Sequence, residues 1–131
     1  MCLSSAVSCK DNRINLEYYE LSHNVAKIEL VNISKESDYY NIEVIKTLEE
    51  DMHQEVLRKI ASMDFYVMFG GPQPLEGKGI IIYDDTFKLT ITPRVMCKEY
   101  LEDTSDKLSS GEFWYDISAD EDFCKLLEEL S

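Results

Sequence analysis

The chain has 131 residues, of which 44% are hydrophobic, and its formal net charge is −13 at pH 7. This length and apolar content exclude an intrinsically disordered chain and predict one folded domain. The acidic balance disfavours nucleic acid and anionic lipid as partners, because like charges repel.

Residues 1–10 show no regular pattern, and we expect them to be irregular or frayed. They lack the basic and apolar regions of a signal peptide, and no apolar run reaches the roughly 18 residues of a membrane span. We therefore expect a cytoplasmic protein without a membrane partner. The four cysteines lack partners at the spacing of a zinc site, and no motif indicates another ligand, so we expect no metal and no cofactor.

Alternation of polar and apolar residues predicts strands in the first third of the chain. Residues 14–19 and 27–31 alternate with period two, and residues 22–24 are suited to a turn between them. A polar loop is expected over 34–38, followed by a third strand over 40–45. The chain is thus expected to begin with three strands.

The first helix is expected over residues 47–63. Thr47 and Glu50 have the spacing of a capping box, in which two side chains satisfy backbone amides at a helix start. The apolar stripe that follows at helical spacing consists of Leu48, Met52, Val56, Ile60 and Met63. This stripe predicts an amphipathic helix that covers a sheet.

Apolar residues without alternation at 65–69 are typical of a central strand that is covered on both faces. The loop at 70–79 contains four glycines but no lysine followed by serine or threonine, so it does not predict a phosphate site. Residues 80–92 predict a hairpin that turns at Asp84 and Asp85.

The last strand is expected over 112–117 and a second amphipathic helix over 118–130, with Ser118 and Glu121 as its capping box. Strands and helices in this order predict an α+β fold. We expect one compact domain over 1–131, with a mainly antiparallel sheet of six to eight strands and two amphipathic helices.

Catalytic chemistry has little support in the sequence. The only histidines are His23 and His53, and we interpret both as solvated or structural. Asp84 and Asp85 are better explained as a hairpin turn than as paired catalytic acids. We therefore predict that the chain is not an enzyme, with a small Cys/His enzyme as an alternative.

Acidic residues are concentrated towards the C-terminus, where residues 99–131 hold eleven acidic side chains and two lysines. In the predicted strand 112–117, alternation places Glu112, Trp114 and Asp116 on one face if the other face packs on the core. Tryptophan is enriched in interface hot spots, and carboxylates attract cationic partners. The alternative is that the C-terminal helix covers Trp114 and buries it.

Two tyrosine doublets, at 18–19 and 39–40, extend this interpretation, because one member of each doublet faces away from the other on a strand. The residues that we expect to bind a partner are Glu112, Trp114, Asp116, Asp120, Glu121, Tyr19, Tyr39, Glu99, Glu102 and Asp103.

These observations predict a non-enzymatic acidic protein that binds and neutralises a basic protein. Its expected class is the immunity or antidote protein of a nuclease-type toxin pair. The alternative is an inhibitor, encoded by a phage or mobile element, that mimics nucleic acid and blocks a host nucleic-acid-binding machine. The oligomeric state is not determined by the sequence.

Overall fold

The computed structural model describes residues 13–14, 16–36, 39–68, 75–100, 112–119 and 121–131. Within these ranges, only the backbone is described for residues 13, 112–116 and 118–119. The expectation for residues 1–10 lies outside the described residues. In chain order the elements are β1 (Arg13–Ile14), α2 (Tyr18–Ser22), β2 (Val25–Glu36), β3 (Tyr39–Thr47), α3 (Glu50–Ala61), β4 (Phe65–Val67), β5 (Gly77–Asp84), β6 (Phe87–Ile91), β7 (Val95–Tyr100), β8 (Glu112–Ala119) and α4 (Glu121–Leu130).

The strands form one sheet in the order β1-β4-β8-β7-β6-β5-β2-β3, and every described pairing in it is antiparallel. The α+β class, the antiparallel sheet and the single domain expected from the sequence are confirmed. β4 and β8 come together although they are far apart in the chain, whereas β5 to β8 follow one another in chain order.

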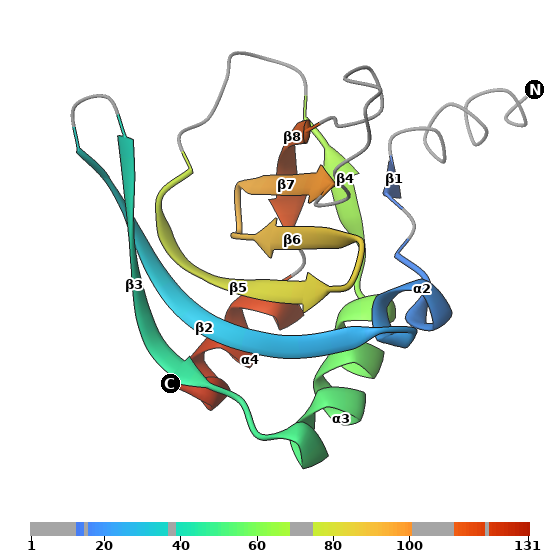
Figure 1. The fold of residues 1–131 in the computed structure, drawn as a ribbon. Helices are drawn as coiled ribbons and strands as arrows, with labels where there is room; N and C mark the ends of the chain where they lie inside the picture. Colours follow the sequence, from blue (N-terminus) through green and yellow to red (C-terminus); the bar gives the residue numbers. More distant parts are fainter. Residues whose placement is uncertain (1–12, 15, 37–38, 69–74, 101–111, 120) are drawn as a thin grey trace, which may run out of the picture.

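The helices α3 and α4 pack on the same side of the sheet (Figure 1). Their buried residues join those of the strands in the main apolar core. Phe65 of β4 and Phe123 of α4 are fully buried there, with their rings edge to face and their centroids 5.6 Å apart. This contact ties the C-terminal helix to the end of the sheet at which β4 lies.

A smaller apolar cluster covers part of the opposite face of the sheet. It contains Val31, Ile33, Ile81 and Val95, with Leu75 from the segment before β5 packed among them. Because these strand residues alternate with residues of the main core, both faces of the central strands carry apolar side chains. This explains the continuous apolar run in β5.

The hairpin of β2 and β3 projects beyond the rest of the sheet (Figure 1). β2 has 12 residues and pairs with β5 along most of its length, whereas β3 is the outermost strand. β2 continues to Glu36, so the polar loop expected at 34–38 was placed too early. Residues 34–36 therefore belong to β2, and β3 begins at Tyr39.

Both helices begin later than expected. α3 begins at Glu50 and has no side-chain cap, because Thr47 is the last residue of β3 and pairs with Glu29. α4 begins at Glu121, because Ser118 belongs to β8 and pairs with Tyr66. The two predicted capping boxes were therefore wrong. Each expected cap residue lies in a strand and pairs with a neighbouring strand, so it does not begin the helix.

Two predicted strands also need correction. The first, 14–19, is a two-residue strand followed by the helix α2, in which Tyr18 and Leu21 face the core at helical spacing. The second, 65–69, is the three-residue β4, which lies next to the edge strand β1. Tyr66 and Met68 are exposed, so this segment is not covered on both faces. Phe69 lies outside the described residues.

Gly79 of β5 allows the close approach of β5 and β6. A Cβ atom at this position would lie 2.6 Å from the carbonyl oxygen of Ile91, and a backbone atom cannot move away cheaply. We predict that Gly79→Ala lowers the free energy of unfolding by about 1–3 kcal/mol, measured by urea denaturation. Asn32→Ala, at an exposed position of β2, is the control and should change it by less than about 0.5 kcal/mol. Equal effects of the two variants would contradict the close approach.

Candidate functional site

The outermost strand β3 holds five of the nine exposed large hydrophobic residues in the described part of the chain. All nine of its residues are exposed. Five of them are large apolar or aromatic residues with exposed fractions between 37% and 62%, namely Tyr39, Tyr40, Ile42, Val44 and Ile45. We call this set the β3 edge.

Ile42 and Val44 lie opposite Ile33 and Val31 of β2, so all four share one face of the sheet. Ile33 and Val31 are buried in the smaller apolar cluster, whereas Ile42 and Val44 remain exposed beside it. The β3 edge thus extends a buried apolar surface into solvent. Within the described residues, no strand pairs with the outer side of β3.

Natural edge strands are usually protected by charges, bulges or short length, because their free backbone groups can pair with another chain. β3 has some of this protection: Glu43 and Lys46 are charged, and the register shifts next to Val44. It is nevertheless nine residues long and mostly apolar. An edge of this kind can accept a strand or an apolar surface from a partner.

The outer side of the helix layer is acidic. Exposed carboxylates occur in the first turn of both α3 and α4, and Glu128 and Glu129 follow near the end of α4. Lys59 of α3 lies 3.6 Å from Glu55 and 3.5 Å from Glu129, so one cation is shared between the two helices. Such exposed pairs contribute little stability, and the face keeps an excess of negative charge.

A polar network occupies the helix-free face of the sheet next to the smaller cluster. The hydroxyl of Tyr83 donates a hydrogen bond of 2.8 Å to Oε1 of the buried Glu29, and Lys27 Nζ lies 3.5 Å from its Oε2. Lys27 Nζ also lies 4.4 Å from the centre of the Tyr83 ring. The pKa of Tyr83 is raised to about 12, mainly by burial and further by the hydrogen bond to Glu29 and the negative charges of Glu29 and Glu99.

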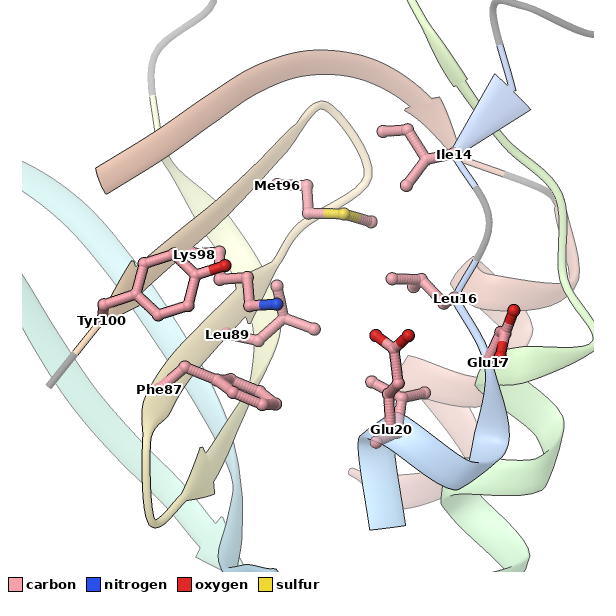
Figure 2. A pocket seen from close by; sticks show the side chains of 10 residues that line it. Ile14, Leu16, Glu17, Glu20, Phe87, Leu89, Met96, Lys98 and Tyr100 are labelled. Atoms are coloured by element: carbon pink, nitrogen blue, oxygen red, sulfur yellow. The ribbon is translucent and has the colours of Figure 1, made fainter. Parts of the chain in front are cut away.

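A cavity of about 330 Å³ lies between the N-terminal segment and strands β6 and β7. Leu16 and Glu20 reach it from one side, and Phe87, Leu89 and Lys98 from the other (Figure 2). The cavity has mostly apolar walls with charged residues among them. On the N-terminal side of the cavity, α2 packs against α3.

The two histidines lie in different environments. His53 is buried on α3 with 8% of its surface exposed, and its Nε2 has no hydrogen-bond partner among the described atoms. His23 is exposed after α2, with its ring 5.1 Å from that of Tyr19. Cys97 is buried in β7 and Cys124 is exposed on α4.

Asp84 has a structural role in the β5–β6 hairpin. Its Oδ2 accepts hydrogen bonds of 3.0 Å from both the backbone N–H and the hydroxyl of Thr86. Its Oδ1 accepts a bond of 3.2 Å from the backbone N–H of Asn24. The carboxylate therefore fixes the turn and joins it to the start of β2, as expected for a turn residue.

The described members of the predicted binding set lie apart from one another. Tyr19 is 68% exposed on α2, next to the start of β2, and Tyr39 is 62% exposed opposite Glu36 at the other end of that strand. Glu99 is half-buried on β7, and Glu121 is exposed in the first turn of α4. Tyr19 and Tyr39 therefore belong to different surfaces.

The remaining members are described only in part. The register pairs Glu112 with Glu99, Trp114 with Cys97 and Asp116 with Val95. The side chains of these three β8 residues, and Asp120, Glu102 and Asp103 as a whole, lie outside the described residues. The expectation that Trp114 is part of a binding face thus stays a prediction.

Sequence reasoning did not select Ile42, Val44 and Ile45. Part of the signal is present in the sequence, since the third strand predicted over 40–45 contains all three residues. What was missing was the position of this strand at the edge of the sheet, because strand order depends on pairing between distant segments.

Comparison of the chain with protein-family models, with curated proteins and with solved structures finds no match. No described helix has the length and apolar content required to cross a membrane. Among the described residues there is also no group of three or more potential metal ligands.

The pKa of Tyr83 predicts a dependence of stability on alkaline pH. Its phenol binds a proton more tightly in the folded state, because its pKa is raised from 10.0 to about 12. The resulting stability is fully present below pH 10 and is lost as the pH rises towards 12. Tyr83→Phe should therefore show a smaller decline of the free energy of unfolding across this window.

At neutral pH, Tyr83→Phe should lower the free energy of unfolding by about 1 kcal/mol, because Glu29 loses a hydrogen-bond donor. Urea denaturation of both proteins at neutral pH, and at several pH values between 10 and 12, measures these effects. Absorbance titration should show that the variant lacks the tyrosine component that ionises near pH 12. The same late component in the variant would contradict the assignment.

The unpartnered nitrogen of His53 predicts that this histidine reduces stability. We expect His53→Leu to raise the free energy of unfolding by about 1 kcal/mol, because a buried polar atom without a partner is removed. His23→Leu is the matched control, and it should change stability by less than about 0.5 kcal/mol because His23 is exposed. A loss of stability in His53→Leu would show that His53 has a favourable partner.

Proposed function

We propose that this chain is a non-enzymatic binding protein for a basic protein partner, and that it acts as the immunity or antidote protein of a nuclease-type toxin pair. The observation that carries the proposal is the β3 edge, whose five exposed apolar and aromatic residues lie on the outermost strand of an eight-stranded sheet. The proposed occupant of this edge is a segment of the basic partner.

The β3 edge offers two kinds of interaction. Its outer backbone groups can hydrogen-bond to an added strand, and its apolar side chains can be buried by the same contact. Tyr39 and Tyr40 lie at the hairpin end of β3, where aromatic side chains provide large contact areas with few rotatable bonds. Burial of Ile42 and Val44 would also complete the smaller apolar cluster.

The charge of the chain supports a cationic occupant. With a net charge of −13, the chain attracts basic proteins over distances of about a Debye length and accelerates their association. The same charge disfavours a second copy of the chain at the β3 edge, because two such molecules repel each other. It also disfavours nucleic acid.

An antidote to a nuclease needs no chemistry of its own. A nuclease binds phosphates through a basic surface, and an acidic protein can cover that surface in place of the substrate. The exposed carboxylates of α3 and α4 are suited to this long-range attraction, while the β3 edge provides the apolar contact that slows dissociation.

The proposal is tested by capturing proteins from the source cells on the immobilised chain and identifying the partner by mass spectrometry. We expect a basic protein with nuclease activity that the purified chain inhibits in a one-to-one complex. Its affinity should fall as the salt concentration rises, because the attraction is partly electrostatic. A captured protein without nuclease activity, or one whose binding is independent of salt, would contradict this function.

A matched pair of variants then locates the contact. Ile42→Lys places a charge on the β3 edge, whereas Gln54→Lys makes the same charge change at an exposed position of α3. We expect Ile42→Lys to weaken the complex roughly tenfold or more, and Gln54→Lys to change affinity by less than about twofold. Surface plasmon resonance measures both, with circular dichroism as the folding control. Equal affinities of the two variants would exclude the β3 edge.

A further inference from the structure

The cavity between the N-terminal segment and strands β6 and β7 lies apart from the β3 edge, since β5 and β2 separate β6 from β3 in the sheet. Its volume of about 330 Å³ is within the range of small-molecule sites. We propose that this cavity binds a small organic cation, composed of an apolar body and one protonated amine.

The apolar body is accommodated by the walls of the cavity. Leu89 and Met96 form part of the sheet side and are buried members of the main core. Ile14 and Leu16 form part of the opposite side, and both are only partly buried against that core. Figure 2 shows these side chains directed towards the space between the two sides. An apolar ligand would therefore cover groups that the fold leaves incompletely packed.

The charged residues at the cavity favour a cation. Glu17 and Glu20 line it from the N-terminal side, and Figure 2 shows the carboxylate of Glu20 directed into the space. Neither carboxylate forms an ion pair with a described residue. The Glu20 carboxylate is thus a hydrogen-bond acceptor that a protonated amine in the cavity can use.

Lys98 does not reverse this preference. Its ammonium group lies 4.5 Å from the centre of the Phe87 ring and 5.2 Å from that of Tyr100. The negative faces of the two rings thus already stabilise its charge within the protein. Because the two rings stabilise the ammonium group of Lys98, the carboxylate of Glu20 stays available to a cationic ligand.

A second hollow continues from the cavity past Glu20, Phe87, Lys98 and Tyr100. It is lined by further aromatic side chains, including Tyr19 and His23, whose rings are in contact. Aromatic faces are favourable surroundings for an organic cation. This arrangement gives the exposed Tyr19 a binding role that does not depend on the partner of the β3 edge.

The probe for the test is phenethylamine, with phenethyl alcohol as its neutral counterpart and hydrocinnamate as its anionic counterpart. Titrations followed by NMR of the leucine and methionine methyl groups report contact with Leu16, Leu89 and Met96 directly. We expect phenethylamine to shift these signals and to bind roughly fivefold more tightly than the alcohol, because only the amine pairs with Glu20. Stronger binding of the anion, or no binding of the amine, would overturn the proposal.

Variants show whether the cavity is the site. Glu20→Gln should remove the preference for the amine over the alcohol, whereas Glu128→Gln, an equal charge change on α4, should leave it intact. Leu16→Trp fills the cavity and should abolish binding of both compounds. Retention of the amine preference in Glu20→Gln would refute the assignment even if Leu16→Trp does not fold.

Discussion

Burial of one face of the sheet beneath α3 and α4 is the constraint on which the rest of the structure depends. Ile28, Leu30, Ile80 and Ile82 point into this layer from β2 and β5, and each is fully buried. Because side chains alternate along a strand, a shift of one residue in register would turn all of them away from the helices. The layer therefore determines the register of the central strands and the position of every polar residue on the opposite face.

The two ends of the sheet differ because the helix layer covers them unequally. At the β4 end, the contact of Phe65 with Phe123 closes the core. At the other end, β2 and β3 extend beyond the helices, and the side chains of β3 are exposed throughout. The apolar side chains of β3 therefore stay exposed in the monomer and do not contribute burial to its stability. A partner that covers them would bury this surface, which is the physical basis of the proposed contact.

The organic-cation site has a different origin. α2 is short and follows the two-residue β1, and residues of this N-terminal segment line the cavity opposite β6 and β7. The cavity and the β3 edge are separated by β5 and β2. Occupation of one does not require occupation of the other, and the two proposals can be judged separately.

Local patterns predicted the secondary structure correctly where the apolar residues followed a single period. The stripe at Val56 and Ile60 identified α3, and the alternation around Asp84 and Asp85 identified the β5–β6 hairpin. Capping signals failed at Thr47 and Ser118, because a strand can extend into a potential cap when a neighbouring strand offers hydrogen bonds. The segment at 14–19 was too short for its period to separate a strand from a helix.

The sequence by itself determined the α+β class, the two amphipathic helices and the strongly acidic charge, since these follow from composition and short-range periodicity. Only the tertiary structure decided that β3 is the edge strand, that Glu29 and Tyr83 meet across the sheet, and that Glu20 faces Lys98 over a cavity. These features depend on contacts between residues far apart in the chain. Such contacts are selected by the packing of the whole core, and no local pattern encodes them.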